Sequence, residues 1–195
     1  MINVVIGTMK SSKTAVLINF FDTFQEVGMD SVVFYPSCCE KKEDYVVSRD
    51  NNKQAKAVKV FDISDMYHYV KNKRVVFIDE FQFITNSEHL DEFMNFLEYC
   101  DKNDKIVYLH GLNLDYTGTA FDIVQRVIPY ADNVIIKHAK CECCGEDANR
   151  CVRYIDGILD DGLDSDILLM EDENIVYKSV CKKCYRKITN KPVIK

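Results

Sequence analysis

A phosphate-binding pattern follows a short apolar run near the beginning of the chain. It consists of eight consecutive residues, Gly7-Thr8-Met9-Lys10-Ser11-Ser12-Lys13-Thr14. The pattern G-x-x-x-x-G-K-[ST] curls backbone N–H groups around a phosphate at a helix N-terminus, where the helix dipole favours an anion. Lys13 is then expected to reach the β- and γ-phosphates of a nucleotide, and the Thr14 hydroxyl to coordinate Mg²⁺. The segment therefore predicts a nucleotide-binding phosphate loop.

Ser12 occupies the position at which this pattern has its second glycine. If the backbone there is left-handed, the Cβ atom costs on the order of 1 kcal/mol, and if it is helical the cost is small. The competing interpretation is an ordinary strand–turn–helix connection with a serine that caps the helix. The position of the segment directly after an apolar strand favours the phosphate loop.

Two adjacent carboxylates, Asp79 and Glu80, follow another apolar run at residues 75–78. In P-loop enzymes an aspartate at such a strand end serves the Mg²⁺ ion opposite the loop hydroxyl. Neighbouring side chains on a strand point in different directions, so one carboxylate can serve the metal while the other accepts a proton from an attacking hydroxyl. A solvated strand end is the alternative. The presence of Lys13 and Thr14 in the same chain favours the catalytic interpretation.

Four cysteines form two C-x₂-C pairs, Cys141 with Cys144 and Cys181 with Cys184. Each pair lets two thiolates meet one metal ion from a single tight turn, and four thiolates make a closed, structural Zn²⁺ site. Disulfides are the alternative, but no other feature indicates secretion. Cys143 would break the spacing if it were a ligand. We assign no chemistry to the remaining thiols and imidazoles, Cys38, Cys39, Cys100, Cys151, His68, His89, His110 and His138.

The overall composition limits the classes of partner. The chain has 195 residues and a net charge of -6, so it has no general electrostatic attraction to nucleic acid or to anionic lipid. No apolar run approaches the roughly 18 residues that a membrane helix needs. The chain begins with an apolar run that no basic segment precedes, so we expect no secretory signal. We therefore expect a cytoplasmic protein without a nucleic-acid or membrane partner.

Strands and helices are predicted to alternate over the first two thirds of the chain. Short apolar runs predict strands at residues 4–6, 31–35, 58–61, 74–79, 106–109 and 133–136. Helical spacing of apolar residues predicts helices at 13–28, 64–71, 90–100 and 121–128. Polar residues 37–55 have no clear period and are expected to form a mobile loop or an irregular hairpin. The alternation predicts an α/β fold with a mostly parallel, buried sheet flanked by helices.

The composition changes at Lys140, where cysteines begin and helical periodicity ends. We therefore predict two domains. Residues 1–140 would form a P-loop-like nucleotide-binding domain, and residues 141–195 a small domain around the Cys₄ zinc site.

The order of these motifs resembles the zinc-containing, P-loop type of thymidine kinase family, over nearly the whole chain. The segment Asp79-Glu80-Phe81-Gln82-Phe83 is similar to the D-E-x-Q-F signature of that family. Residues 111–116, continuing to Phe121, resemble its G-L-D-x-D-F…F segment, and residues 137–141 its K-L-x-A-x-C approach to the zinc module. The resemblance implies a P-loop NTPase-like sheet followed by a Cys₄ zinc-ribbon or lasso domain.

The resemblance also implies an activity, the transfer of the ATP γ-phosphate to the 5′-hydroxyl of a deoxynucleoside, with thymidine as the substrate. By that likeness Asp79 serves Mg²⁺, Glu80 is the base for the 5′-hydroxyl, and structural Zn²⁺ holds the lasso. The expected nucleoside-binding residues are Met9, Phe83, Leu112, Tyr116, Phe121 and Tyr177. The family forms homotetramers.

The chain departs from the family pattern at three places. Ser12 replaces the second loop glycine, residues 39–41 stand where the family has a D-x-R element, and residues 171–176 contain no Gly-Gly pair ahead of Tyr177. These departures leave a second hypothesis, a nucleotide-binding protein of the same fold without kinase activity. Glu80 favours the enzyme, because a protein that only binds nucleotide has no use for a proton acceptor.

Overall fold

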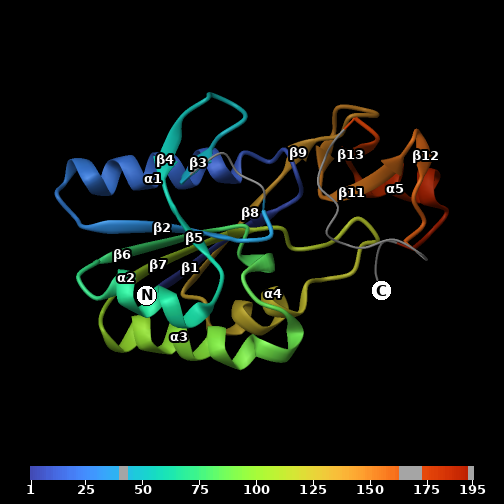
Figure 1. The fold of residues 1–195 in the computed structure, drawn as a ribbon. Coiled ribbons are helices and arrows are strands. Elements are labelled where there is room, and N and C mark those ends of the chain that lie inside the picture. The colour runs from blue at the N-terminus through green and yellow to red at the C-terminus, as the bar shows by residue number, and fades with distance from the viewer. Residues whose placement is uncertain (40–43, 163–172, 193–195) are drawn as a thin grey trace.

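The computed structural model describes residues 1–39, 44–162 and 173–192. Its centre is a six-stranded sheet (Figure 1). The strands are β1 (Ile2–Gly7), β2 (Ser31–Pro36), β5 (Val58–Val60), β6 (Val75–Asp79), β7 (Ile106–Gly111) and β8 (Asn133–Lys137). They lie in the order β5-β2-β6-β7-β1-β8, and every pairing between neighbours is parallel. The predicted parallel α/β sheet is confirmed.

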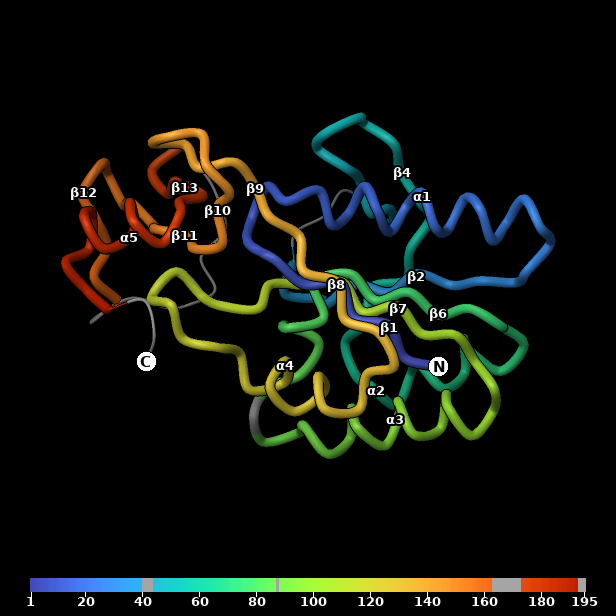
Figure 2. Tube along the Cα trace, turned by 180° about the vertical axis from the view of Figure 1, so that it is seen from behind, coloured from blue at the N-terminus to red at the C-terminus, as the bar shows by residue number. Residues whose placement is uncertain are grey.

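Helices cover both faces of this sheet, which explains why its central strands are apolar without alternation. Helix α1 (Lys13–Glu26) lies on one face, and α2 (Ile63–Val70), α3 (Leu90–Lys102) and α4 (Asp122–Val127) lie on the other (Figures 1 and 2). Leu17 and Ile18 of α1 pack on one face, and Phe93 and Phe96 of α3 pack on the opposite one. The two apolar layers hold the carboxyl ends of the strands in fixed register.

The polar segment predicted as a loop or an irregular hairpin contains a short antiparallel hairpin. Strands β3 (Tyr45–Val47) and β4 (Gln54–Lys56) pair beside α1, where they bury Val46 and Ala55. Short 3₁₀ turns follow β6, precede α3 and follow α4, at Phe81–Phe83, Ser87–His89 and Ile128–Tyr130. Strands β3 and β4 each bury only one residue, and an alternation this short cannot be distinguished from a loop in the sequence.

The cysteine-rich part of the chain, from residue 139 on, lies beyond the carboxyl end of β1 (Figures 1 and 2). It contains β9 (Ala139–Lys140) paired with β10 (Asp147–Ala148). A second antiparallel sheet has the order β12-β11-β13, with β11 (Arg150–Ile155), β12 (Ile158–Leu159) and β13 (Ile175–Val180). The division into domains after Lys140 stays a prediction.

The prediction that helical periodicity ends at Lys140 is wrong, because α5 (Lys182–Thr189) follows β13 directly. Cys181 is its N-cap, and the Cys184 N–H donates to the Cys181 Sγ atom over 3.4 Å. The second cysteine pair therefore starts a helix, and Tyr185 is the residue of α5 that is buried. Among the residues that the structure describes, no helix has the length and apolarity needed to cross a membrane.

Candidate active site

The phosphate loop connects β1 to α1 and contains two non-glycine residues in left-handed conformation. Lys10 has φ 58°, and Ser12 has φ 62° and ψ 24°. Within the described part of the chain, the Ser12 side chain makes no capping hydrogen bond to α1. The interpretation of Ser12 as a capping serine is therefore wrong, and its Cβ carries the left-handed cost of roughly 1 kcal/mol. Strain of this kind is typical of functional loops.

Gly7 ends β1 at a point where only glycine fits. A Cβ atom there would lie 2.1 Å from the carbonyl oxygen of Lys137 at the end of β8. The close approach of the two strands fixes where the loop begins.

Lys13 folds back into the phosphate loop. Its Nζ atom donates to the Thr8 carbonyl over 2.7 Å and to the Ser11 Oγ atom over 3.3 Å. Burial lowers the pKa of Lys13, and the nearby carboxylates of Glu80 and Asp79 act in the opposite direction. The ammonium group is thus held inside the loop by Thr8 and Ser11.

Thr14 and Asp79 come together across the carboxyl edge of the sheet. The Thr14 hydroxyl donates to the Asp79 Oδ2 atom over 3.3 Å, and the Asp79 side chain is buried. Hydroxyl and carboxylate oxygens are the hard ligands that Mg²⁺ prefers. The pair therefore fits a magnesium ion that also binds nucleotide phosphates.

Glu80 is the next residue along the chain and has a left-handed backbone, with φ 52° and ψ 40°. The Gln82 Nε2 atom donates to the Glu80 Oε2 atom over 2.6 Å, and the Gln82 Oε1 atom accepts from the Leu112 N–H over 2.9 Å. A Cβ atom on Gly111 would lie 2.2 Å from that Gln82 oxygen. Gln82 therefore holds the Glu80 carboxylate in place, a role that its position in the D-E-x-Q-F segment did not reveal.

His110 makes a further contact at this site, which no motif in the sequence indicated. It lies on β7, one residue before the end of the strand, and is paired with Asp79 of β6. Its side chain is fully buried, and its Nδ1 atom lies 3.0 Å from the Lys13 carbonyl oxygen. Because a carbonyl only accepts, Nδ1 carries the hydrogen. Burial lowers the pKa of His110 to about 4, although Asp79 acts in the opposite direction. His110 is therefore a neutral imidazole that fixes the first turn of α1.

The residues expected around a nucleoside form two aromatic groups. The Phe83 and Phe121 rings meet edge to face with centroids 5.5 Å apart. Tyr116 and Tyr177 meet with centroids 6.5 Å apart and share an apolar cluster with Met9. Leu112, which donates to Gln82, follows the carboxyl end of β7.

A fully buried arginine, Arg153 of β11, joins the two tyrosines. Its guanidinium carbon lies 3.8 Å from the centroid of the Tyr116 ring, and its nitrogens donate to the Tyr116 hydroxyl over 2.7 Å and to the Tyr177 hydroxyl over 3.1 Å. Asp160 accepts from the Arg153 Nε atom over 2.7 Å. Nothing in the sequence pattern indicated this, because arginine is mostly exposed in proteins.

The four predicted zinc ligands lie together. The Sγ atoms of Cys141, Cys144, Cys181 and Cys184 are all within 4.8 Å of one another. The Cys144 sulfur lies 3.7 Å from the Cys181 sulfur and 3.7 Å from the Cys184 sulfur. Four sulfurs at about 2.3 Å from one tetrahedral ion are about 3.8 Å apart, so the cluster fits Zn²⁺. Cys143 is exposed and, among the described residues, is not part of the cluster.

The thiol electrostatics agree with metal binding. Burial disfavours the Cys141 thiolate, but backbone N–H groups of Cys181, Cys143 and Cys144 outweigh it and lower the pKa of Cys141 to about 6. The Cys184 N–H lowers the pKa of Cys181. Hydrogen bonding with the neighbouring Cys144 thiol raises the pKa of Cys184. Crowded thiols of this kind all ionise only when a cation balances them.

The parallel sheet carries a phosphate loop after its first strand. Beside this loop lie a hydroxyl–carboxylate pair and a glutamate whose carboxylate is fixed by a hydrogen bond. These features together define the class of P-loop phosphotransferases. Comparison with known proteins gives the family. A family model described as thymidine kinase matches residues 1–185. The chain belongs to the thymidine kinase family.

Curated relatives match this chain over 83% to 98% of their own length. The chain is 30% identical over 189 residues to a thymidine kinase of Pyrobaculum aerophilum, which covers 95% of this chain and 98% of the relative. It is 26% identical over 194 residues to a thymidine kinase of Mycoplasmoides gallisepticum, and the match covers 98% of this chain and 83% of the relative. A thymidine kinase of Pseudothermotoga lettingae is 24% identical over 192 residues, with 97% of each chain covered. The resemblance stated from the motifs is confirmed.

Two departures from the family pattern lie wholly or partly outside the described residues. The first is at residues 39–41, in place of the D-x-R element, where Glu40 and Lys41 lie outside the described part. The second is at residues 171–176, without a Gly-Gly pair, where residues 171–172 lie outside it.

Proposed function

We propose that this chain transfers the γ-phosphoryl group of ATP to the 5′-hydroxyl of thymidine. The observation that carries the proposal is the convergence of Lys13, Thr14, Asp79 and Glu80 at one edge of the sheet, with Thr14 and Asp79 3.3 Å apart. Membership of the thymidine kinase family and the names of the relatives support the substrate. Deoxynucleoside and ATP are the small-molecule partners, and the acidic chain needs no nucleic-acid partner.

Different residues of the chain bind the phosphates, hold the metal ion and accept the proton. The N–H groups of residues 7–14 and the Lys13 ammonium bind the phosphates, and Thr14 and Asp79 would hold Mg²⁺, which neutralises phosphate charge when bound. The 5′-oxygen of the nucleoside bonds to the γ-phosphorus as the bond to the ADP oxygen breaks. Glu80 accepts the proton of the 5′-hydroxyl, and Gln82 keeps its carboxylate directed at that proton.

The nucleoside would lie between the aromatic groups. Flat apolar rings at Phe83, Phe121, Tyr116 and Tyr177 suit a flat base, and Leu112 and Met9 complete the proposed lining. Arg153 would keep the two tyrosines at a fixed separation. Structural Zn²⁺ on the four cysteines would order the part of the chain that carries Tyr177.

A cytoplasmic homotetramer is part of the proposal. Strand β8 forms one edge of the central sheet and leaves Val134, Ile135 and Ile136 exposed by 42%, 43% and 58%. An apolar edge strand is a surface that another copy of the chain would cover.

The alternative, a nucleotide-binding protein without kinase activity, has no specific observation in its favour among the described residues. A glutamate that is held in a strained backbone by a dedicated glutamine has a use in proton transfer and none in binding alone.

The test uses the purified, zinc-loaded protein with Mg-ATP and separate nucleosides, and follows ADP release together with the nucleoside monophosphate. Thymidine should be phosphorylated at the highest kcat/KM among thymidine, deoxyuridine, deoxycytidine, deoxyadenosine and deoxyguanosine. Lys13→Met should remove transfer, because its ammonium stabilises charge on the transferred phosphate. A folded, zinc-loaded protein that phosphorylates none of these nucleosides would overturn the proposal.

A further inference from the structure

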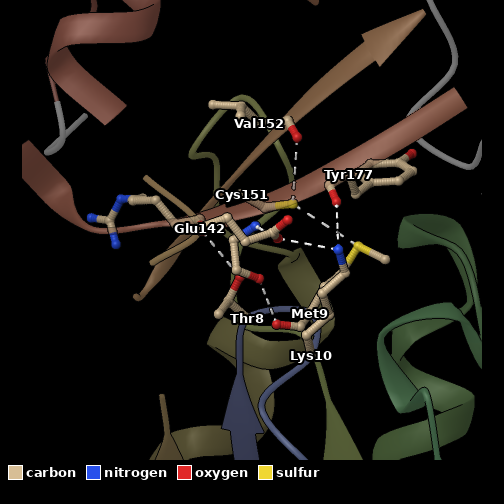
Figure 3. Close-up of polar contacts among 9 residues, drawn as sticks. Thr8, Met9, Lys10, Glu142, Cys151, Val152 and Tyr177 are labelled. Atoms are coloured by element: carbon tan, nitrogen blue, oxygen red, sulfur yellow. Dashed lines mark hydrogen bonds and ion pairs between the residues drawn. The ribbon is translucent and has the colours of Figure 1, made fainter. Parts of the chain in front are cut away.

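Lys10 belongs to the phosphate loop, yet its side chain contacts the cysteine-rich part of the chain. Its Nζ atom donates to the Glu142 Oε1 atom over 3.1 Å and to the Tyr177 carbonyl oxygen over 3.1 Å, as Figure 3 shows. Its backbone is left-handed, with φ 58°. Lys10 stands at an unspecified position of the loop pattern, and its side chain is directed at residues more than one hundred positions away.

The two loop residues before Lys10 are tied to the same part of the chain (Figure 3). The Thr8 hydroxyl donates to the Arg150 carbonyl over 3.2 Å, and the Met9 carbonyl accepts from the Ser179 hydroxyl over 2.7 Å. The Met9 sulfur lies 3.9 Å from the Cys151 sulfur. Three consecutive loop residues thus contact β11 and β13 or the segments beside them.

Glu142 is the residue that connects these contacts to the zinc site. It lies between Cys141 and Cys144, so a metal ion on those thiolates would fix the backbone on both sides of it. Its Oε1 atom also accepts from the Ser179 N–H over 2.8 Å, and its own N–H donates to the Ser179 carbonyl over 2.9 Å. The Glu142 carboxylate, which accepts the Lys10 hydrogen bond, is therefore fixed both by its own hydrogen bond from Ser179 and by that of its backbone N–H.

We propose that Lys10 and Glu142 are a pair of positioning residues that couple the zinc site to the phosphate loop. Zinc on the first cysteine pair orders Glu142, Glu142 holds Lys10, and Lys10 keeps the loop in the conformation that binds phosphate. The proposal rests on the proposed function in one respect, that the loop binds nucleotide. It adds that zinc supports the ATP site through Glu142 and Lys10, besides ordering the part of the chain that carries Tyr177.

The coupling has a reciprocal consequence. If zinc favours the loop conformation that binds nucleotide, nucleotide must favour zinc retention by the same factor. The ion pair itself is partly exposed, with side-chain exposures of 41% and 36%, so the effect of either single variant is expected to be modest.

The first experiment is a double-mutant cycle with Lys10→Met, Glu142→Gln and both together, measured as the Kd of Mg-ATP by calorimetry on zinc-loaded protein. Each single variant should weaken ATP binding about five-fold, and the double variant should be no weaker than about five-fold in total. Lys10→Arg should restore most of the affinity, because it keeps the charge and donors. Lys102→Met, whose partner Glu98 lies 2.9 Å away on α3, is the matched control and should bind ATP as the wild type does.

The second experiment measures the Kd of zinc by equilibrium competition with a chelator, with and without Mg-ATP. Mg-ATP should lower the Kd of zinc about five-fold in the wild type and have little effect on it in Lys10→Met. Three results would each overturn the coupling: unchanged or tighter ATP binding in Glu142→Gln, fully additive losses in the cycle, or a zinc Kd of the wild type that does not change with ATP. A wild-type protein that binds no ATP would overturn the proposed function and the coupling together, whereas ATP binding with unaffected variants would overturn the coupling alone.

Discussion

The Gln82 carboxamide donates to the Glu80 carboxylate over 2.6 Å while its oxygen receives the Leu112 N–H over 2.9 Å. The turn after β6 is thereby tied to the end of β7, and the glutamate cannot rotate independently of the sheet. A general base must lie within hydrogen-bond reach of the proton that it takes, so the proposal that Glu80 is that base predicts that this contact affects the rate of transfer.

Gln82→Leu should lower kcat by about 10- to 100-fold with a much smaller change in the Kd of Mg-ATP, because the base loses its orientation and the loop is untouched. Gln25→Leu is a matched control. Gln25 lies at the end of α1 farthest from the phosphate loop, where its side chain donates to the Ser31 hydroxyl. Steady-state kinetics with thymidine and calorimetry with ATP give both quantities. A kcat equal to that of the wild type would show that Glu80 needs no such support.

Glu80→Gln should lower kcat by at least about 100-fold and leave ATP binding nearly unchanged, because the amide cannot accept the proton. The same two measurements test it. If the loss is instead confined to ATP affinity, Glu80 belongs with Asp79 among the groups that hold the metal.

His110 gives the protein a specific sensitivity to acid. Its pKa is about 4 in the folded state and 6.5 in the unfolded chain, so the unfolded chain binds more protons between these values. The free energy of unfolding should therefore fall as the pH falls from 6.5 toward 4, by up to about 3 kcal/mol in total.

Urea denaturation of the wild type and of His110→Asn at pH 7.5 and pH 5 checks this contribution. Asparagine can still donate to the Lys13 carbonyl but does not titrate, so the variant should lose less stability on acidification. Both proteins carry the same zinc site, so acid release of zinc cancels in the comparison. His68→Asn, on the exposed side of α2, should behave as the wild type does, and an equal pH dependence in His110→Asn would contradict the assignment.

Cys181→Ser should lose the zinc ion and loosen residues between the cysteine pairs, because a closed Cys₄ site contributes its binding free energy to folding. Nucleoside binding should weaken through Tyr177. Cys143→Ser is the matched control and should retain one zinc ion per chain, since Cys143 is exposed and outside the described sulfur cluster. Metal analysis of the two variants decides the ligand set, and zinc retained in Cys181→Ser but lost in Cys143→Ser would show that it is wrong.

The local patterns of the sequence were enough for the architecture and for the chemistry-bearing groups. Apolar runs that end in Gly7 and Asp79 predicted buried parallel strands, because such strands need no polar face. Lys13 with Thr14, and the C-x₂-C pairs, are recognisable because the chemistry itself requires a short fixed spacing. These features depend on residues close together along the chain.

Other features were decided only when distant segments packed together. The sequence placed Gln82 in a signature without a role, assigned His110 no chemistry, and gave no sign that Arg153 is buried between two tyrosines. The left-handed backbone at Ser12 and the helix that follows Cys181 were likewise not determined by local preference.

The physical reason is the range of the interactions. A strand or a metal-binding turn is specified by residues a few positions apart, whereas the hydrogen bonds of Lys10 to Glu142, and of Arg153 to Tyr116, join residues whose distance along the chain carries no periodic signal. Burial then determines which of these polar groups must be satisfied and which pKa values move, and burial belongs to the folded chain alone.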